Sequence, residues 1–147
     1  MELIFATNNQ HKLREIREII QDGFNILSLD DVGFKEEIPE EQSTLEGNAS
    51  QKAWHIFQRY KKNCFADDTG LEVQALNNQP GVFSARYAGS GKDSDANMNK
   101  LLYELRNIQN RKARFRTVIS LIWNNREFQF EGIVNGSILY EKKGKEG

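Results

Sequence analysis

The spacing of hydrophobic residues in the first part of the chain predicts a strand, a helix and a second strand. Leu3–Ala6 and Phe24–Leu29 are short, continuous apolar runs, which is the pattern of buried strands. Between them we expect an amphipathic helix from His11 to about Gln21. Its apolar residues recur at helical spacing: Leu13, Ile16, Ile19 and Ile20.

The middle of the chain predicts a loop, a second helix and two strands around a turn. Gly33–Gln42 is acidic and irregular, so we interpret it as an exposed loop. Ser43–Glu46 reads Ser-Thr-Leu-Glu and matches a capping box, which predicts that a helix begins there. Its apolar residues are Leu45, Ala49, Ala53, Ile56, Phe57 and Tyr60. Asn63–Ala66 and Leu71–Leu76 are predicted strands on either side of an Asp-Asp-Thr-Gly turn.

The last part predicts one more helix and a long hairpin. The breaker Asn77–Gly81 precedes a capped helix from near Asp93 to Arg106. Its inward residues are Met98, Leu101, Leu102 and Leu105. Ala113–Trp123 is a predicted strand, Asn124-Asn125 is a hairpin signal, and Phe128–Tyr140 continues as extended chain. Alternating strands and helices followed by a hairpin predict a mixed α/β fold.

Length, charge and cysteine content narrow the class of protein. A chain of 147 residues predicts one domain, or one domain with a small second lobe. A net charge of −1 provides no basic field that would attract nucleic acid. The apolar N-terminal run is too short for a signal peptide or a membrane span. Cys64 is the single cysteine, and its apolar neighbours predict a reduced core thiol. By default these features predict a cytoplasmic protein.

The strongest chemical signal is the carboxylate pair Asp67-Asp68 at the end of an apolar segment. Two adjacent Asp residues repel each other unless a cation or the turn backbone offsets their charge. Carboxylates hold Mg²⁺ or accept a proton from water. The alternative is an Asx-type turn, which explains one Asp better than two.

Cationic and polar residues on the two helices are weaker candidates. Thr7, Asn9 and Lys12 lie where the first strand meets the first helix, a natural anion site, although Thr and Asn are also ordinary turn residues. Glu46 and Lys52 flank the buried face of the second helix. Glu46 is equally well explained as the acid of the capping box, and Lys52 as a surface lysine. We expect both carboxylates of the Asp pair to face one cavity together with the two ammonium groups.

Several segments, taken in order, resemble the inosine/xanthosine triphosphate pyrophosphatase family, the Ham1-like nucleoside triphosphate pyrophosphatases. Ala6–Lys12 looks like the family's phosphate-binding Thr/Ser-x-Asn-x-x-Lys motif. Thr44–Ala49 with Lys52-Ala53 is similar to its acidic helix start. Ala66–Gly70 and Pro80–Gly89 match its two most characteristic stretches. The resemblance covers essentially the whole chain.

The resemblance implies an elongated, two-lobed α/β fold with a mixed twisted sheet, flanking helices and a central cleft. It implies a homodimer that hydrolyses non-canonical purine nucleoside triphosphates, such as ITP, dITP and XTP, to the monophosphate and pyrophosphate with Mg²⁺. Asp68 is then the base that activates water, and Asp67 with an acid near Glu46 holds the metal. The implied substrate-binding residues are Thr7, Asn9, Lys12, Lys52, Thr69, Ser84 and Arg86.

Two departures from the family pattern qualify this expectation. Many relatives carry Glu where this chain has Gly47. The family also continues past Gly144–Gly147 with a Phe-Gly-Tyr-Asp-Pro stretch and a Ser-His-Arg motif that supply much of base recognition. We therefore expect a C-terminally incomplete domain with weak or absent activity and poor purine discrimination. Two alternatives stay open: a nucleotide-binding remnant, and a related house-cleaning pyrophosphatase that acts on modified pyrimidine nucleotides.

Overall fold

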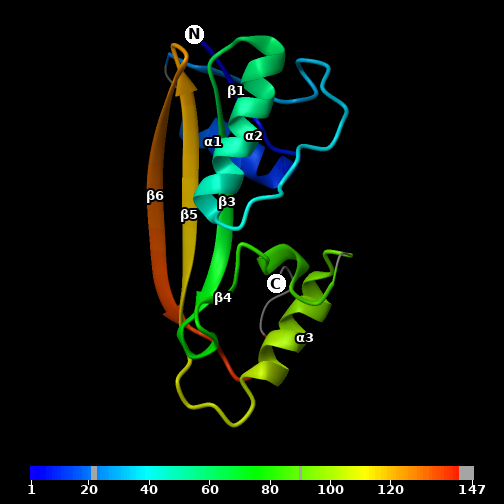
Figure 1. The fold of residues 1–147 in the computed structure, drawn as a ribbon, viewed down its shortest axis with the longest axis vertical. Coiled ribbons are helices and arrows are strands. Elements are labelled where there is room, and N and C mark those ends of the chain that lie inside the picture. The colour runs from blue at the N-terminus through cyan, green and yellow to red at the C-terminus, as the bar shows by residue number, and fades with distance from the viewer. Residues whose placement is uncertain (21–22, 90, 143–147) are drawn as a thin grey trace. The chain divides into compact units, whose positions relative to one another are not determined.

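The computed structural model describes residues 1–20, 23–89 and 91–142 (Figure 1). The chain divides into two compact units: unit 1 contains residues 1–68 and 118–131, and unit 2 contains residues 69–117 and 132–147. The helices are α1 (Gln10–Ile19), α2 (Leu45–Tyr60) and α3 (Ser94–Glu104), with short 3₁₀ helices η1 (Gln74–Leu76) and η2 (Ser84–Arg86). The strands are β1 (Glu2–Phe5), β2 (Asn25–Leu27), β3 (Cys64–Val73), β4 (Gln79–Gly81), β5 (Lys112–Trp123) and β6 (Arg126–Ser137).

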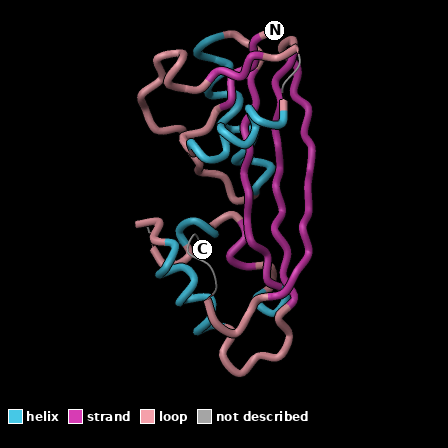
Figure 2. Tube along the Cα trace, turned by 180° about the vertical axis from the view of Figure 1, so that it is seen from behind, coloured by secondary structure: helices cyan, strands magenta, loops and turns pink. Residues whose placement is uncertain are grey.

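The strands form one mixed sheet in the order β2-β1-β3-β5-β6, with β4 paired to β3 (Figure 2). β1 is parallel to both β2 and β3, whereas β4 is antiparallel to β3. The turn between β5 and β6 is Asn124-Asn125, whose φ angles of 50° and 65° suit a tight hairpin. The predicted strand–helix–strand unit, the hairpin and the mixed α/β class are confirmed.

Unit 1 buries both faces of its part of the sheet, one under each helix. On one face, Ile4, Ala66 and Ile56 belong to a cluster to which α2 contributes. On the other face, Leu13 of α1 packs with Phe5 and Phe65, whose rings stack 4.3 Å apart. Because side chains alternate along a strand, neighbouring residues of β1 and β3 supply the two cores.

The sequence prediction of two strands around an Asp-Asp-Thr-Gly turn is wrong. β3 is one continuous strand that includes Asp67 and Asp68, and the chain beyond Val73 forms η1 rather than extended structure. Asp is unfavourable in strands, which is why the sequence pattern suggested a turn. In the structure, each carboxylate instead finds polar or cationic partners on a neighbouring helix, and these partners offset the local preference.

The start of α2 and the loop before it also differ from expectation. The N-cap is Thr44, whose Oγ1 accepts a hydrogen bond from the Gly47 amide at 2.9 Å. The third helical position is therefore Gly47 and not Glu46, so no capping box forms. The Gly33–Gln42 segment is irregular as predicted, but it is not fully exposed, because Phe34 is 4% exposed and packs in the α2-face cluster.

Unit 2 is organised around α3, which begins with Asp93 as its N-cap. Leu101 and Leu105 of α3 pack against Val73 of β3, in agreement with the predicted inward face. None of the helices that the structure describes is long and apolar enough to cross a membrane. The predicted end of the first helix at Gln21 and the Gly144–Gly147 segment lie outside the described residues.

The predicted core thiol provides a test of the unit 1 packing. Cys64 is free and fully buried, its Sγ donates to the Ala53 carbonyl, and burial raises the pKa of the thiol to about 12. At pH 8 only roughly one thiol in 10⁴ is then the reactive thiolate. We expect native protein to react very slowly with a thiol reagent such as DTNB, and denatured protein to release one equivalent rapidly. A Cys64→Ala variant gives the blank, and rapid labelling of native protein would contradict this packing.

Candidate active site

The turn between β1 and α1 is built by the polar side chains that the sequence singled out. Thr7 Oγ1 accepts a hydrogen bond from the Asn9 amide at 3.1 Å. Asn9 is the N-cap of α1, and its Oδ1 accepts from the Lys12 amide at 3.1 Å. These contacts correspond to the ordinary-turn interpretation of Thr7 and Asn9. They also place Lys12 in the first turn of α1, facing β3.

Lys12 and Asp67 form an ion pair on the α1 face of the sheet. Lys12 Nζ lies 2.7 Å from Asp67 Oδ2, and the two side chains are 35% and 10% exposed. Asp67 follows Phe65 by two residues, so it extends the face of β3 that packs on α1. A buried carboxylate needs such a partner, because an unpaired charge is costly in a low-dielectric environment.

Asp68 lies on the opposite face of β3, beside α2. It follows Ala66, which belongs to the α2-face cluster. Its carboxylate accepts a hydrogen bond from the Asn48 side chain, whereas its Oδ2 is buried and has no partner among the described residues. The continuous strand directs Asp67 and Asp68 to different faces of the sheet, and the expectation that both face one cavity stays a prediction.

The pKa of the Asp68 carboxyl is raised above its ordinary value. Burial is the largest cause, because it disfavours the charged form. The Lys52 ammonium and the Asn48 hydrogen bond lower the pKa, and the negative charges of Glu40 and Asp67 raise it. The pKa of Asp68 thus stays above its ordinary value because Lys52 and Asn48 offset the effect of burial only in part.

Glu40 is a site residue that the sequence analysis did not select. Lys52 Nζ donates to Glu40 Oε1 at 3.0 Å, and the Lys52 side chain is only 10% exposed. Lys52 is therefore not a surface lysine, and it brings Glu40 into the surroundings of Asp68. Glu40 was hidden in a run of acids that resembled a solvated loop. The sequence feature that could have indicated Glu40 is the apolar Ile38 in the same run, which packs against the α2-face cluster.

Glu46 occupies the first turn of α2, where its backbone carbonyl accepts a hydrogen bond from Gln129 Nε2 at 3.0 Å. Its predicted role as a metal ligand stays a prediction. The neighbouring Gly47 is closely packed, because a Cβ added there would lie 2.8 Å from Gln42 Cβ. A larger residue at this position requires the preceding loop to move.

The remaining predicted residues lie in unit 2. The Thr69 hydroxyl is hydrogen-bonded to the Thr117 hydroxyl at 2.8 Å. Ser84 Oγ donates to the Gly81 carbonyl at 2.6 Å and accepts from the Leu71 amide at 2.8 Å, so it ties η2 to β3. Arg86 is half-buried, and its guanidinium has no hydrogen bond or ion pair with any other described residue.

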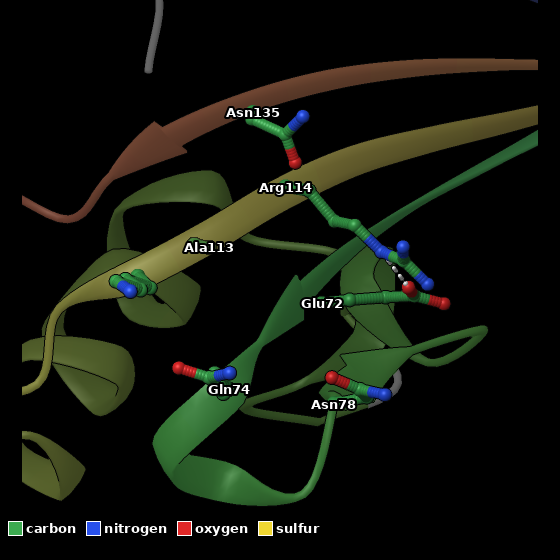
Figure 3. A pocket seen from close by; sticks show the side chains of 7 residues that line it. Glu72, Gln74, Asn78, Ala113, Arg114 and Asn135 are labelled. Carbon is green, nitrogen blue, oxygen red and sulfur yellow. Dashed lines mark hydrogen bonds and ion pairs between the residues drawn. The ribbon is translucent and has the colours of Figure 1, made fainter.

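Three pockets accompany these residues. In unit 1, a polar pocket of about 530 Å³ adjoins the β1–α1 turn and is lined by Thr7, Asn8 and Gln10 among others. In unit 2, a mostly apolar pocket of about 330 Å³ includes Thr69 and Ser84. A second pocket of unit 2, of about 360 Å³, contains the Arg114–Glu72 ion pair and no residue selected from the sequence (Figure 3).

These features define a mixed α/β protein with acidic and cationic side chains on both faces of one strand. The Ham1 family profile matches residues 3–147. A dITP/XTP pyrophosphatase of Flavobacterium psychrophilum is 52% identical over 147 residues, which are 100% of this chain and 77% of that protein. The corresponding protein of Bacillus subtilis is 42% identical over 150 residues, covering 99% of this chain and 76% of that protein. The chain belongs to the Ham1 family.

Solved structures support the same assignment. The Ham1 protein of Staphylococcus aureus is 38% identical and superposes with a TM-score of 0.90, covering 100% of this chain and 77% of that one. A Ham1 protein of Coxiella burnetii is 33% identical, with a TM-score of 0.90 and the same two coverages. The chain thus spans about three quarters of the length of these relatives.

The partly buried Lys12–Asp67 pair should contribute more to stability than an exposed ion pair of the same chain. Replacing Lys12 with Met leaves the Asp67 carboxylate buried without its cation, which should lower the free energy of unfolding by about 1–3 kcal/mol in urea titration. Lys62→Met is the matched control, because Lys62 and Glu2 form a half-exposed pair at 3.5 Å. That variant should change stability by less than about 0.5 kcal/mol. Equal effects of the two variants would contradict a special role for the buried pair.

Proposed function

We propose that this chain hydrolyses non-canonical purine nucleoside triphosphates, such as dITP and XTP, to the nucleoside monophosphate and pyrophosphate. The observation that carries the proposal is Asp68, a carboxylate with a buried oxygen that the protein leaves without a partner. The substrate class comes from the relatives of Flavobacterium psychrophilum and Bacillus subtilis, which are dITP/XTP pyrophosphatases. Attack of water on the α-phosphorus breaks its bond to the bridging oxygen and releases pyrophosphate.

Asp68 is the general base in this reaction. Its Oδ2 is buried and has no hydrogen-bond partner among the described residues, so the protein leaves this oxygen as an unused acceptor, while Asn48 engages the carboxylate. A general base whose pKa lies near the operating pH typically raises the rate 10²–10⁴-fold. Burial moves the pKa of Asp68 upward and so makes it a stronger base than an exposed Asp.

Cationic side chains from two helices bind the phosphate oxygens. Lys12 of α1 and Lys52 of α2 lie on opposite faces of β3. The last register pair between β1 and β3 is Phe5 with Phe65, so β1 ends before the level of Asp67. A triphosphate that passes the end of β1 therefore has access to both faces. Thr7 and Asn9 of the β1–α1 turn, and Thr69, Ser84 and Arg86 of unit 2, remain the proposed further substrate contacts.

The acidic residues near Asp68 suit Mg²⁺. Among the described residues, no three His, Cys, Asp or Glu side chains gather closely enough to hold a metal ion by themselves. Mg²⁺ is usually bound by one or two carboxylates together with substrate phosphates and water. Glu40, whose charge acts on Asp68, joins the predicted Asp67 and Glu46 as a proposed ligand. When bound, the ion would neutralise phosphate charge and polarise the phosphorus. We also propose a cytoplasmic homodimer.

The base assignment is tested with Asp68→Asn, which keeps the shape of the side chain and removes its basicity. We expect pyrophosphate release from dITP to fall at least about 100-fold at saturating Mg²⁺. Asp95→Asn is the control, because the Asp95 side chain is 68% exposed and pairs with Lys142 at the surface. The control should retain full activity. Wild-type turnover by Asp68→Asn would refute the assignment of the base.

The metal requirement is tested separately. Removing divalent ions with EDTA should abolish pyrophosphate release, and added Mg²⁺ should restore it. Glu40→Gln should raise the Mg²⁺ concentration that gives half-maximal activity, because one charged ligand is lost. Glu37→Gln, in the same acidic segment but exposed, is the matched control. Activity that is indifferent to EDTA would eliminate the metal from the mechanism.

A further inference from the structure

The segment Glu36–Gln42, here called the acidic strap, is tied lengthwise to α2. Its contacts are the bidentate Glu36–Arg59 pair at 3.0 and 2.9 Å, the Glu40–Lys52 pair at 3.0 Å, the Glu41 amide to Gln51 Oε1 at 2.9 Å, and the Gln42 amide to Asn48 Oδ1 at 2.8 Å. As the strap advances, its partners recede along the helix, so the two segments run antiparallel. The strap is therefore fixed by side chains of one helix rather than by a sheet.

Asn48 is the point at which the acidic strap meets the candidate base. The residue is 2% exposed. Its Oδ1 accepts from the Gln42 amide, which orients the side chain so that its NH₂ group faces the other way. That group donates to the Asp68 carboxylate. One buried amide thus uses its acceptor on the strap and a donor on Asp68.

Asn48 and Lys52 act on Asp68 in different ways. The ammonium of Lys52 is engaged by Glu40 at 3.0 Å and acts on Asp68 through its charge. Asn48 supplies a directional hydrogen bond, which fixes the plane of the carboxylate. Because Oδ2 is the oxygen without a partner among the described residues, the bond from Asn48 engages the other oxygen of the carboxylate.

We propose that Asn48 is a positioning residue for the reaction: it fixes the orientation of the Asp68 carboxylate, whose Oδ2 the protein leaves without a partner, and couples that orientation to the acidic strap carrying Glu40. The inference rests on the proposed function. Misplacing a reacting group by about 1 Å can cost a factor of about 100 in rate, so loss of this contact should act on turnover rather than on substrate binding.

The test compares Asn48→Ala, Asn48→Asp and Gln51→Ala. Asn48→Asp keeps the acceptor for the Gln42 amide but loses the donor to Asp68. Gln51→Ala removes a strap contact on the same helix without touching Asp68. We expect both Asn48 variants to lower kcat for dITP about 10- to 100-fold with KM within about twofold of wild type. We expect Gln51→Ala to leave kcat within about twofold of wild type.

A double-mutant cycle separates failure of this inference from failure of the proposed function. In the Asp68→Asn background, Asn48→Ala should lower the residual kcat by less than about threefold, because the residue acts through Asp68. The same cycle measured by urea unfolding needs no activity and should be non-additive.

Full kcat in Asn48→Asp, or a loss with Gln51→Ala as large as with the Asn48 variants, would overturn the positioning role. If Asn48→Ala does not fold, Asn48→Asp decides the question. If the protein has no pyrophosphatase activity but the unfolding cycle is non-additive, both the proposed function and the positioning role are refuted. Only the contact between Asn48 and Asp68 is then supported.

Discussion

Two consecutive carboxylates within a continuous strand impose the constraint on which the rest of unit 1 depends. Because side chains alternate, Asp67 and Asp68 enter different faces of the sheet, and both faces are buried cores. Each face must then provide polar partners at the same level of β3. α1 supplies Lys12 to one carboxylate, and α2 supplies Asn48 and the charge of Lys52 to the other. The positions of both helices are thereby linked to the chemistry of one strand.

The same constraint explains why the loop before α2 is ordered at the site although it has no regular structure. Lys52 is buried beside Asp68, and a buried ammonium favours a close carboxylate. Glu40 is that carboxylate, and the strap that delivers it is held by Arg59, Gln51 and Asn48 along the helix. The acidic segment therefore lines the site instead of extending into solvent. Its charge acts on Asp68 and favours the binding of a divalent cation.

Local patterns in the sequence sufficed for elements whose signals are local. The Asn124-Asn125 hairpin, the Asp93 cap and the apolar face of α3 were all predictable, because each depends on a few adjacent residues. β3 was not, since the preference of Asp for turns is offset by partners that lie 55 residues away in the case of Lys12. Glu40 was missed for the same reason: its role depends on Lys52, twelve residues further along the chain.

The unpartnered oxygen of Asp68 argues for function on energetic grounds. A buried polar atom without a hydrogen bond costs about 1–3 kcal/mol, so one that a fold retains calls for an explanation. Asp67, one residue earlier, shows how the fold neutralises a carboxylate, with an ammonium at 2.7 Å. The charge of Lys52 acts on Asp68, yet its ammonium donates a hydrogen bond to Glu40. The arrangement leaves the Asp68 carboxyl incompletely satisfied, which suits the proposed role of taking a proton from water.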